Sequence, residues 1–129
     1  MKEKGMERRG NMRFRLVALD VDGTLLNDRY ELTPATKDTV KKVSDAGVEV
    51  VFCTGRSPVS VFPLLQELDM QGTIITHNGA ATVDSATRKV IHLYPIPTEE
   101  LFPFIAYCRA HGVHFDVNSA FGIYTESEN

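Results

Sequence analysis

The sequence predicts an α/β fold in which a parallel sheet is flanked by helices. Two mostly apolar runs, residues 16–21 and 48–53, have the composition of strands that are buried on both faces. Helix signals fill the segment between them. Strands that alternate with helices form right-handed crossover units with parallel strands. The carboxyl ends of such strands meet at one edge of the sheet, which is where ligands bind.

Two helices are predicted after these strands. Thr33 supplies an N-cap hydroxyl and Pro34 fits the first helical position, so the first helix is expected to begin there. Apolar residues recur at helical spacing in residues 61–68, which predicts the second. Because Pro63 would break that helix in mid-run, its start is placed near Ser60, with the proline in the first turn.

Two carboxylates end the first predicted strand. Asp20 lies where the strand leaves the core, Asp22 follows on the same side, and Gly23 permits a sharp turn beside a ligand. Two crowded acids favour a divalent cation between them, and Mg²⁺ prefers carboxylate and phosphate oxygens. Such a pair can transfer a phosphoryl group, with Asp20 attacking phosphorus and Asp22 acting as general acid and base. The other interpretation is a pair of acids that caps a helix or faces solvent.

Residues 20–25, Asp-Val-Asp-Gly-Thr-Leu, together with the preceding strand, resemble the first signature of the haloacid dehalogenase superfamily. In phosphatases of that family the first Asp is the nucleophile and the second is the general acid and base. The resemblance therefore implies these roles for Asp20 and Asp22, a Rossmann-like sheet, and Mg²⁺ as a cofactor that both acids hold.

Thr54, Gly55 and Arg56 follow the second predicted strand. A hydroxyl and a free backbone N–H at a strand tip are suited to binding a phosphoryl oxygen. Thr54 resembles the family's second motif, a Ser or Thr that orients the transferred phosphate. The resemblance implies that the Gly55 N–H binds the phosphate and that Arg56 lies near the substrate. A Thr-Gly pair after a strand can also be only a turn.

Residues 72–80 contain a short strand that leads into Asn78 and Gly79. Asn-Gly readily adopts the positive φ of tight turns, so a hairpin is predicted, with residues 81–83 as the returning strand. The segment resembles the Asn-Gly-Ala segment of the Cof-like branch, subfamily IIB. This resemblance implies that Asn78 and Gly79 lie near the substrate, although the interpretation as a turn alone stays open.

The pattern changes beyond about residue 84. Residues 89–93 read as a strand, and a helix is expected to open at residues 98–100, with its regular turns beginning a few residues later than Thr98 because of Pro103. Residues 113–118 and 121–124 alternate apolar and polar, which is typical of an antiparallel hairpin with one wet face. The helix has four apolar residues at the spacing of one buried face: Leu101, Phe104, Ile105 and Cys108.

This last part resembles the beginning of the α/β cap domain that Cof-like phosphatases insert into their core. The chain is accordingly expected to comprise a basic, disordered tail (1–12), the N-terminal part of a core domain (13–84) and a truncated cap (85–129). The family's later motifs, a Lys or Arg and further acids for Mg²⁺, are not found, so the resemblance covers the first half only. Without the strands that would flank it in the family, the apolar segment 14–21 is expected to be an exposed edge that causes aggregation or self-association.

Composition excludes some classes of function. A net charge of −3 and a pI near 5.8 do not indicate the positively charged surface that binds nucleic acid. No apolar run is long enough to span a membrane, and no signal-peptide pattern precedes the first strand. Cys53 and Cys108 are expected to be buried thiols in a reducing compartment, the cytoplasm. Cys53 is rejected as a phosphatase nucleophile because the arginine needed six positions later is absent, Val59 standing there.

Two classes of function remain. The first is Mg²⁺-dependent hydrolysis of small phosphorylated metabolites through an aspartyl phosphate, sugar phosphates being the commonest substrates of the branch that the chain resembles. The second is a truncated, catalytically silent fragment that binds phosphate or a partner weakly.

Overall fold

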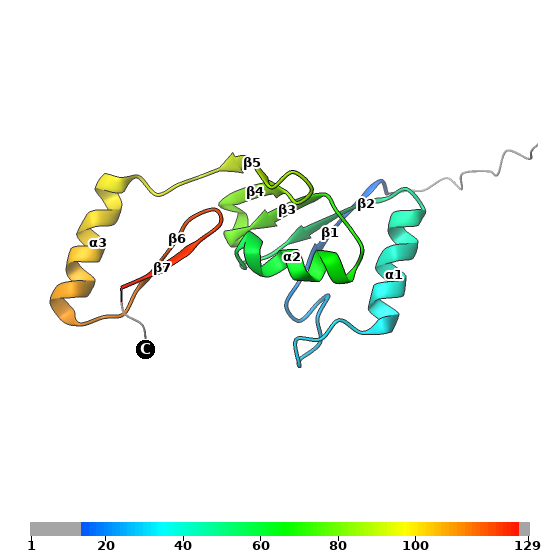
Figure 1. The fold of residues 1–129 in the computed structure, drawn as a ribbon, viewed down its shortest axis with the longest axis horizontal. Coiled ribbons are helices and arrows are strands. Elements are labelled where there is room, and N and C mark those ends of the chain that lie inside the picture. The colour runs from blue at the N-terminus through cyan, green and yellow to red at the C-terminus, as the bar shows by residue number, and fades with distance from the viewer. Residues whose placement is uncertain (1–13, 127–129) are drawn as a thin grey trace, which may run out of the picture.

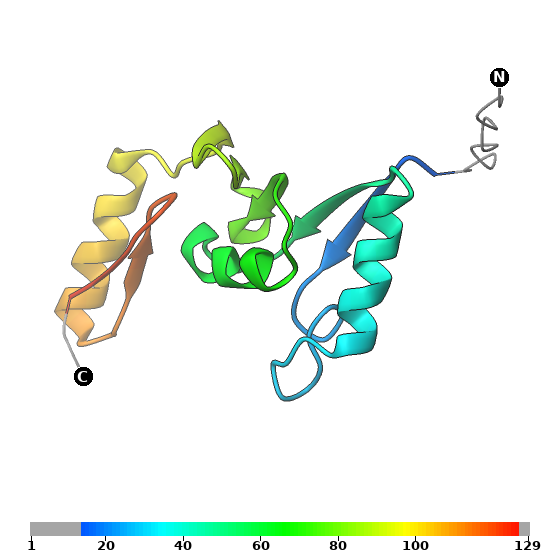
Figure 2. The same cartoon turned by 45° about the vertical axis from the view of Figure 1, so that its right-hand side comes forward.

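The computed structural model describes residues 14–126. A sheet flanked by two helices occupies one end of the molecule, and a third helix with a small hairpin occupies the other (Figures 1 and 2). The elements in chain order are β1 (Leu16–Asp20), α1 (Pro34–Asp45), β2 (Glu49–Cys53), α2 (Pro58–Glu67), β3 (Thr73–Thr76), the 3-10 turn η1 (His77–Gly79), β4 (Ala81–Asp84), β5 (Lys89–Leu93), α3 (Thr98–His111), β6 (Asp116–Asn118) and β7 (Ile123–Thr125).

The five-stranded sheet has the order β1-β2-β3-β4-β5. Strands β1, β2 and β3 run parallel, which confirms the predicted α/β class, and α1 and α2 are the crossover helices between them. Strands β4 and β5 then add antiparallel to the far side of β3. The hairpin predicted at Asn78 is therefore confirmed, with β4 as the returning strand.

One hydrophobic core lies between the sheet and the two crossover helices. Two right-handed crossovers that progress in the same direction place both helices on the same face of a sheet. Strand β2 contributes Val50 and Phe52, which point to one face because they are two positions apart. The core cluster also includes residues of α1, α2, β3 and β4, among them Val40, Leu65, Ile74 and Val83.

The start of α1 is confirmed and the start of α2 was predicted wrongly. Thr33 caps α1, since its hydroxyl oxygen accepts from the backbone N–H of Thr36 at 3.2 Å. Helix α2 begins at Pro58 rather than near Ser60, and Pro63 lies inside it. Pro58 itself takes the first helical position, where a missing N–H costs nothing. Burial of one face of α2 in the core then offsets the hydrogen bond that Pro63 cannot donate.

Strand β1 forms one edge of the sheet, as expected from the apolar segment 14–21. Leu16 is 50% exposed, and Ala18 is exposed as well. Val21, just beyond the strand, is fully buried in the core and does not belong to this edge. Residues 16–19 carry no charge, proline or bulge of the kind that usually protects an edge strand.

The C-terminal part contains α3 and the β6–β7 hairpin, which lie side by side (Figures 1 and 2). Helix α3 is regular from Thr98, a few residues earlier than expected, and Pro103 lies inside it. Gly112 ends the helix with a φ of 62°. The predicted buried face is only partly covered: Phe104 is 69% exposed, and no residue of α3 is fully buried. A two-stranded hairpin is too small to enclose a four-residue stripe.

The predicted strand at residues 89–93 is confirmed as β5, which pairs with β4 at the second edge of the sheet. The division of the chain at residue 84 stays a prediction, and the expected basic tail at 1–12 lies outside the described residues. None of the helices within residues 14–126 has the length and apolar character that crossing a membrane requires.

Candidate active site

The sequence motifs converge at the edge where β1, β2 and β3 end. Asp20 is the last residue of β1 and stands opposite Cys53, the last residue of β2. Thr54 follows Cys53, and Asn78 lies just beyond the end of β3. Because the strands are parallel, their carboxyl ends share one side of the sheet. This is the placement that a ligand site in an open α/β sheet requires.

Asp20 presents an unengaged carboxylate at this edge. Its side chain is exposed and makes no hydrogen bond or ion pair with any residue in 14–126. Burial, and secondarily the negative charge of Asp20, raise the pKa of the Cys53 thiol above its usual value. Cys53 is therefore kept as a protonated thiol, which agrees with rejecting it as a nucleophile.

Asp22 is held by Arg56 through a two-pronged ion pair. Arg56 Nε donates to Oδ2 of Asp22 at 2.9 Å, and Arg56 Nη2 donates to Oδ1 at 2.6 Å. The hydrogen bonds to Asp22 raise the pKa of Arg56. Backbone bonds from the N–H groups of Leu25 and Leu26 to the carbonyl of Val21, at 3.0 and 2.9 Å, shape the loop that carries Asp22. Arg56, expected near the substrate, thus lies beside the second acid.

Thr54 is buried and fixed by three hydrogen bonds. Its N–H donates to the carbonyl of Ile75 at 2.9 Å, and its carbonyl accepts from the N–H of Asn78 at 3.1 Å. Its hydroxyl oxygen accepts from the N–H of Arg56 at 3.1 Å. Within residues 14–126 no acceptor takes the hydroxyl hydrogen of Thr54. A threonine hydroxyl has one such hydrogen, which is left to donate to a bound oxygen.

Asn78 packs directly against Gly55. A Cβ built on Gly55 would lie 2.8 Å from Oδ1 of Asn78, so the loop accepts no larger residue here without moving that side chain. His77, Asn78 and Gly79 all have positive φ, at 50°, 56° and 97°. This is the tight turn that the Asn-Gly pair predicts. It places Asn78 at the site, while Gly79 remains at the exposed outer part of the turn.

Two residues at the site, His77 and Asn118, were not predicted from the sequence. The N–H of His77 donates to the carbonyl of Arg56 at 3.1 Å, while Nε2 of the same imidazole is buried with no partner among residues 14–126. Asn118, at the end of β6, lines the same hollows as His77 although it lies about forty positions further along the chain. No local pattern marks either residue, because only the folded chain brings them to this edge.

Two cavities open between the strand tips and the C-terminal part. The larger, of about 560 Å³, has polar lining groups that include Gly55, Asn78, Asp116 and Asn118. Its apolar lining residues come from the end of β5, the connector after it, α3 and β6: Leu93, Ile96, Leu101 and Val117. The smaller, of about 350 Å³, lies over the loop 55–57 and is also lined by Asn118. The larger cavity has the size of a pocket for a small metabolite.

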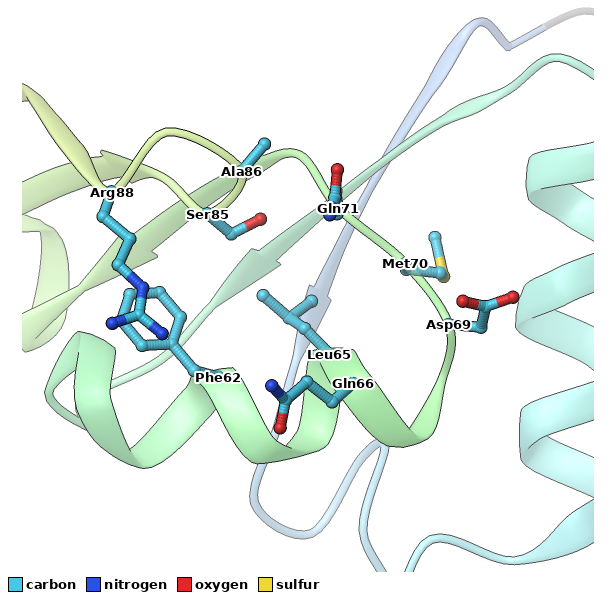
Figure 3. Close-up of a pocket in the computed structure, with 9 residues that line it drawn as sticks. All are labelled: Phe62, Leu65, Gln66, Asp69, Met70, Gln71, Ser85, Ala86 and Arg88. Atoms are coloured by element: carbon cyan, nitrogen blue, oxygen red, sulfur yellow. The ribbon is translucent and has the colours of Figure 1, made fainter.

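A third cavity, of about 640 Å³, lies away from these strand tips. It is formed by α2 and the β4–β5 turn, with Phe62, Asp69 and Arg88 among its lining residues (Figure 3). The guanidinium of Arg88 sits over the ring of Phe62, 5.1 Å from its centroid. None of the residues predicted for the site lines this cavity.

The donor set at the strand tips fits a Mg²⁺ ion that binds together with its substrate. Asp20 and Asp22 offer hard carboxylate oxygens, although those of Asp22 are engaged by Arg56. Within residues 14–126 no group of three or more His, Cys, Asp or Glu side chains could hold a metal. Mg²⁺ commonly uses one or two carboxylates and fills its remaining positions with phosphate oxygens and water. Two acids are therefore enough for this mode, and the metal ligands stay a prediction.

Comparisons with known proteins agree with the fold and with the first motif. A model of the haloacid dehalogenase-like hydrolase family matches residues 17–129. The pyridoxal phosphate phosphatase YbhA of Escherichia coli K12 is 30% identical over 103 residues, which cover 80% of this chain and 38% of that protein. The 5-amino-6-(5-phospho-D-ribitylamino)uracil phosphatase YcsE of Bacillus subtilis is 34% identical over 88 residues, covering 65% and 35%.

A solved structure extends this likeness. TM0651 from Thermotoga maritima superposes with a TM-score of 0.79 at 30% identity, over 90% of this chain and 43% of that one. The chain thus spans less than half the length of the relatives it matches. The resemblance seen in residues 20–25 is confirmed, and this chain belongs to the haloacid dehalogenase-like hydrolases.

Proposed function

We propose that this protein hydrolyses small phosphorylated metabolites through an aspartyl phosphate on Asp20, with Mg²⁺ as cofactor. One observation carries the proposal: an unengaged carboxylate and an unused threonine hydroxyl hydrogen both lie at the edge where parallel strands end. A nucleophile and a donor for a phosphoryl oxygen are the two groups that the first step needs.

In the first step a carboxylate oxygen of Asp20 forms a bond to phosphorus while the bond from phosphorus to the ester oxygen breaks. Asp22 gives a proton to the departing alcohol and later takes one from the water that attacks the phosphoaspartate. The Thr54 hydroxyl and the Gly55 N–H hold the oxygens of the phosphoryl group. A Mg²⁺ ion held by Asp20 and Asp22 would neutralise charge on those oxygens.

The ion pair between Arg56 and Asp22 must open during this cycle. While both carboxylate oxygens of Asp22 accept hydrogen bonds from Arg56, neither oxygen is free to contact the departing alcohol or the attacking water. We infer that the anionic phosphate draws Arg56 away from Asp22, which frees the acid to exchange protons. Arg56 then has the role near the substrate that the family resemblance implies.

The substrate proposed is a small phosphate ester of the sugar-phosphate kind. The cavity of about 560 Å³ beside Gly55 and Asn78 accommodates a molecule of this size. It is lined by polar groups that can bind hydroxyls and by apolar side chains that can contact a carbon skeleton or a ring. The relatives named above act on pyridoxal phosphate and on a phosphoribitylamino-uracil, which are small phosphate esters too. Like the thiols of Cys53 and Cys108, such substrates suit the cytoplasm, where we place the protein.

Hydrolysis of p-nitrophenyl phosphate with and without Mg²⁺ tests this function. The wild-type chain is expected to release nitrophenol only with Mg²⁺, and Asp20→Asn to lower the rate at least about 100-fold, as loss of a nucleophile does. Asp28→Asn, which changes an exposed acid in a neighbouring loop, is the matched control and is expected to keep the wild-type rate. Equal rates in wild type and Asp20→Asn would exclude this activity. Phosphate binding without turnover would support the silent fragment.

A further inference from the structure

The turn of the β6–β7 hairpin is anchored on the core by an aromatic contact. The rings of Phe121, in that turn, and Phe62, in α2, are stacked with centroids 6.4 Å apart and an interplanar angle of 26°. Arg88 covers the same Phe62 ring from the β4–β5 turn (Figure 3). The turn itself is tight, since Ser119 and Gly122 exchange hydrogen bonds of 2.8 and 2.9 Å. The contact between Phe121 and Phe62 therefore positions the end of β6 against the core.

The end of β6 lies on the wall that separates the two cavities of the candidate site. Gly55, His77 and Asn118 line both cavities, although they come from three separate parts of the chain. The carboxamide of Asn118 makes no hydrogen bond with any residue in 14–126. It therefore keeps a donor and an acceptor for a ligand. The Nε2 atom of His77, on the same wall, is also buried without a hydrogen-bond partner among the described residues.

The position next to Gly55 determines which part of a substrate Asn118 can reach. If the Gly55 N–H holds the phosphoryl group, a side chain on the same wall faces the atoms just beyond the ester oxygen. Asp116 and Ser119 of the same hairpin also line the larger cavity, but Asp116 pairs with His114 at 3.3 Å and the hydroxyl of Ser119 bonds to Gly122 within the turn. Apolar lining residues such as Ile96 and Leu101 distinguish a hydroxyl from a methylene weakly, whereas a hydrogen-bonding group such as the carboxamide of Asn118 can do so strongly.

We propose that Asn118 is a specificity-determining residue, whose carboxamide binds a hydroxyl or ring heteroatom on the alcohol part of the phosphate ester. Phe121 is the positioning residue that holds the end of β6 on the core through Phe62. This inference rests on the proposed function, since it needs a phosphate ester in the cavity. Asn118 would distinguish phosphate esters by their alcohol part, whereas the residues at the strand tips bind only the phosphoryl group that all such esters share.

The test compares binding of three probes in the presence of Mg²⁺ by isothermal titration calorimetry: inorganic phosphate, glycerol 3-phosphate and n-propyl phosphate. Every chain in this test also carries Asp20→Asn, so that the esters are not hydrolysed during the titration. The two esters have the same number of carbons and differ in hydroxyls. The chain that is otherwise wild type is expected to prefer the glycerol ester about tenfold. Asn118→Ala is expected to abolish this preference and to leave the affinity for inorganic phosphate unchanged.

Phe121→Ala is expected to lose the preference as Asn118→Ala does, and Phe121→Leu to retain part of it. Tyr124→Ala, on the same hairpin but outside both cavities, is the control and should keep the wild-type ratio. A merely structural role of Phe121 would lower the melting temperature without changing the ratio of ester affinities. An otherwise wild-type chain without preference, or an Asn118→Ala variant that keeps it, overturns the inference and leaves the proposed function standing. Absence of phosphate binding in the otherwise wild-type chain overturns both.

Discussion

The guanidinium of Arg56 holds both carboxylate oxygens of Asp22, with N–O distances of 2.9 and 2.6 Å. The pair connects the loop after β1 to the loop after β2 and so joins two of the motifs predicted from the sequence. Its side chains are 30% and 42% exposed, for Arg56 and Asp22 respectively. Solvent therefore weakens the pair, and its main consequence is for the chemistry of Asp22 rather than for the stability of the fold.

A double-mutant cycle of Arg56→Ala and Asp22→Asn measures this pair. A coupling free energy of about 1 kcal/mol is expected in chemical denaturation, because the geometry is two-pronged but the site is partly exposed. Arg56→Lys is expected to recover only part of it, since an ammonium cannot bind both oxygens in the same plane. Strictly additive effects of the two substitutions would show that the pair does not form in solution.

The pKa of Cys53 provides a second test, which concerns the distance between Asp20 and the neighbouring strand. Because the charge of Asp20 contributes to raising this pKa, Asp20→Asn is expected to lower it and to increase the thiolate fraction at pH 8. Alkylation of Cys53 by iodoacetamide should then be faster, by less than about tenfold since burial is the larger cause. Cys108, followed in the same chain by mass spectrometry, is the control whose rate should not change. An unchanged Cys53 rate contradicts the predicted proximity.

The turn between β4 and β5 gives a prediction of pH dependence. The backbone N–H and the hydroxyl of Thr87 donate to Asp84 at 2.7 and 2.9 Å and lower the pKa of that carboxyl below its ordinary value of 3.8. A lowered carboxyl pKa stabilises the fold above pH 4, and this contribution is lost as the pH falls through the folded-state pKa. Asp84→Asn is therefore expected to lower the melting temperature at pH 7 and to differ less from wild type near pH 3.

Asp38→Asn is the matched control for this pH series, because Asp38 is exposed on α1 and its carboxylate makes no hydrogen bond among the described residues. It should track the wild type at both pH values. A constant difference between Asp84→Asn and wild type from pH 7 to pH 3 would show that the Thr87 hydrogen bonds do not depend on the charge of Asp84.

Most of the core could be predicted because its signals are local. The apolar runs determined β1 and β2, Thr33 and Pro34 determined the start of α1, and the Asn78-Gly79 pair determined the hairpin. The rule that parallel strands end at one edge was then enough to bring the motifs together. Local signals failed where two of them competed: Pro58 and Pro63 both fit a helix start, and burial favoured the earlier one.

The parts that could not be predicted depend on contacts between distant segments. Arg56 was expected near a substrate, and nothing in its neighbourhood in the sequence indicates that it binds Asp22, 34 positions away. Asn118 belongs to a hairpin whose place is set by the contact of Phe121 with Phe62. The exposure of Phe104 likewise follows from how little of α3 the hairpin covers, which helical periodicity cannot report.

The exposed edge of β1 predicts self-association. Its apolar side chains and unpaired backbone groups offer a template for another strand, so the wild type is expected to form oligomers that grow with concentration. Leu16→Lys should shift the population toward monomer in sedimentation velocity, because a charge on an edge strand disfavours pairing. Val113→Lys replaces an equally exposed residue outside any strand, both being 50% exposed, and should leave the association unchanged. A monodisperse wild-type monomer with a cooperative melt contradicts this prediction.

Transfer of a phosphoryl group to Asp20 is the central claim, and the mass of the protein tests it most directly. The chain is incubated with acetyl phosphate and Mg²⁺, quenched in acid to preserve the acyl phosphate, and measured intact and after digestion. We expect one added phosphoryl group in the wild type, located on the peptide that contains Asp20, and none in Asp20→Asn. A wild-type chain that stays unmodified, or an Asp20→Asn variant that is phosphorylated to the same extent, contradicts it.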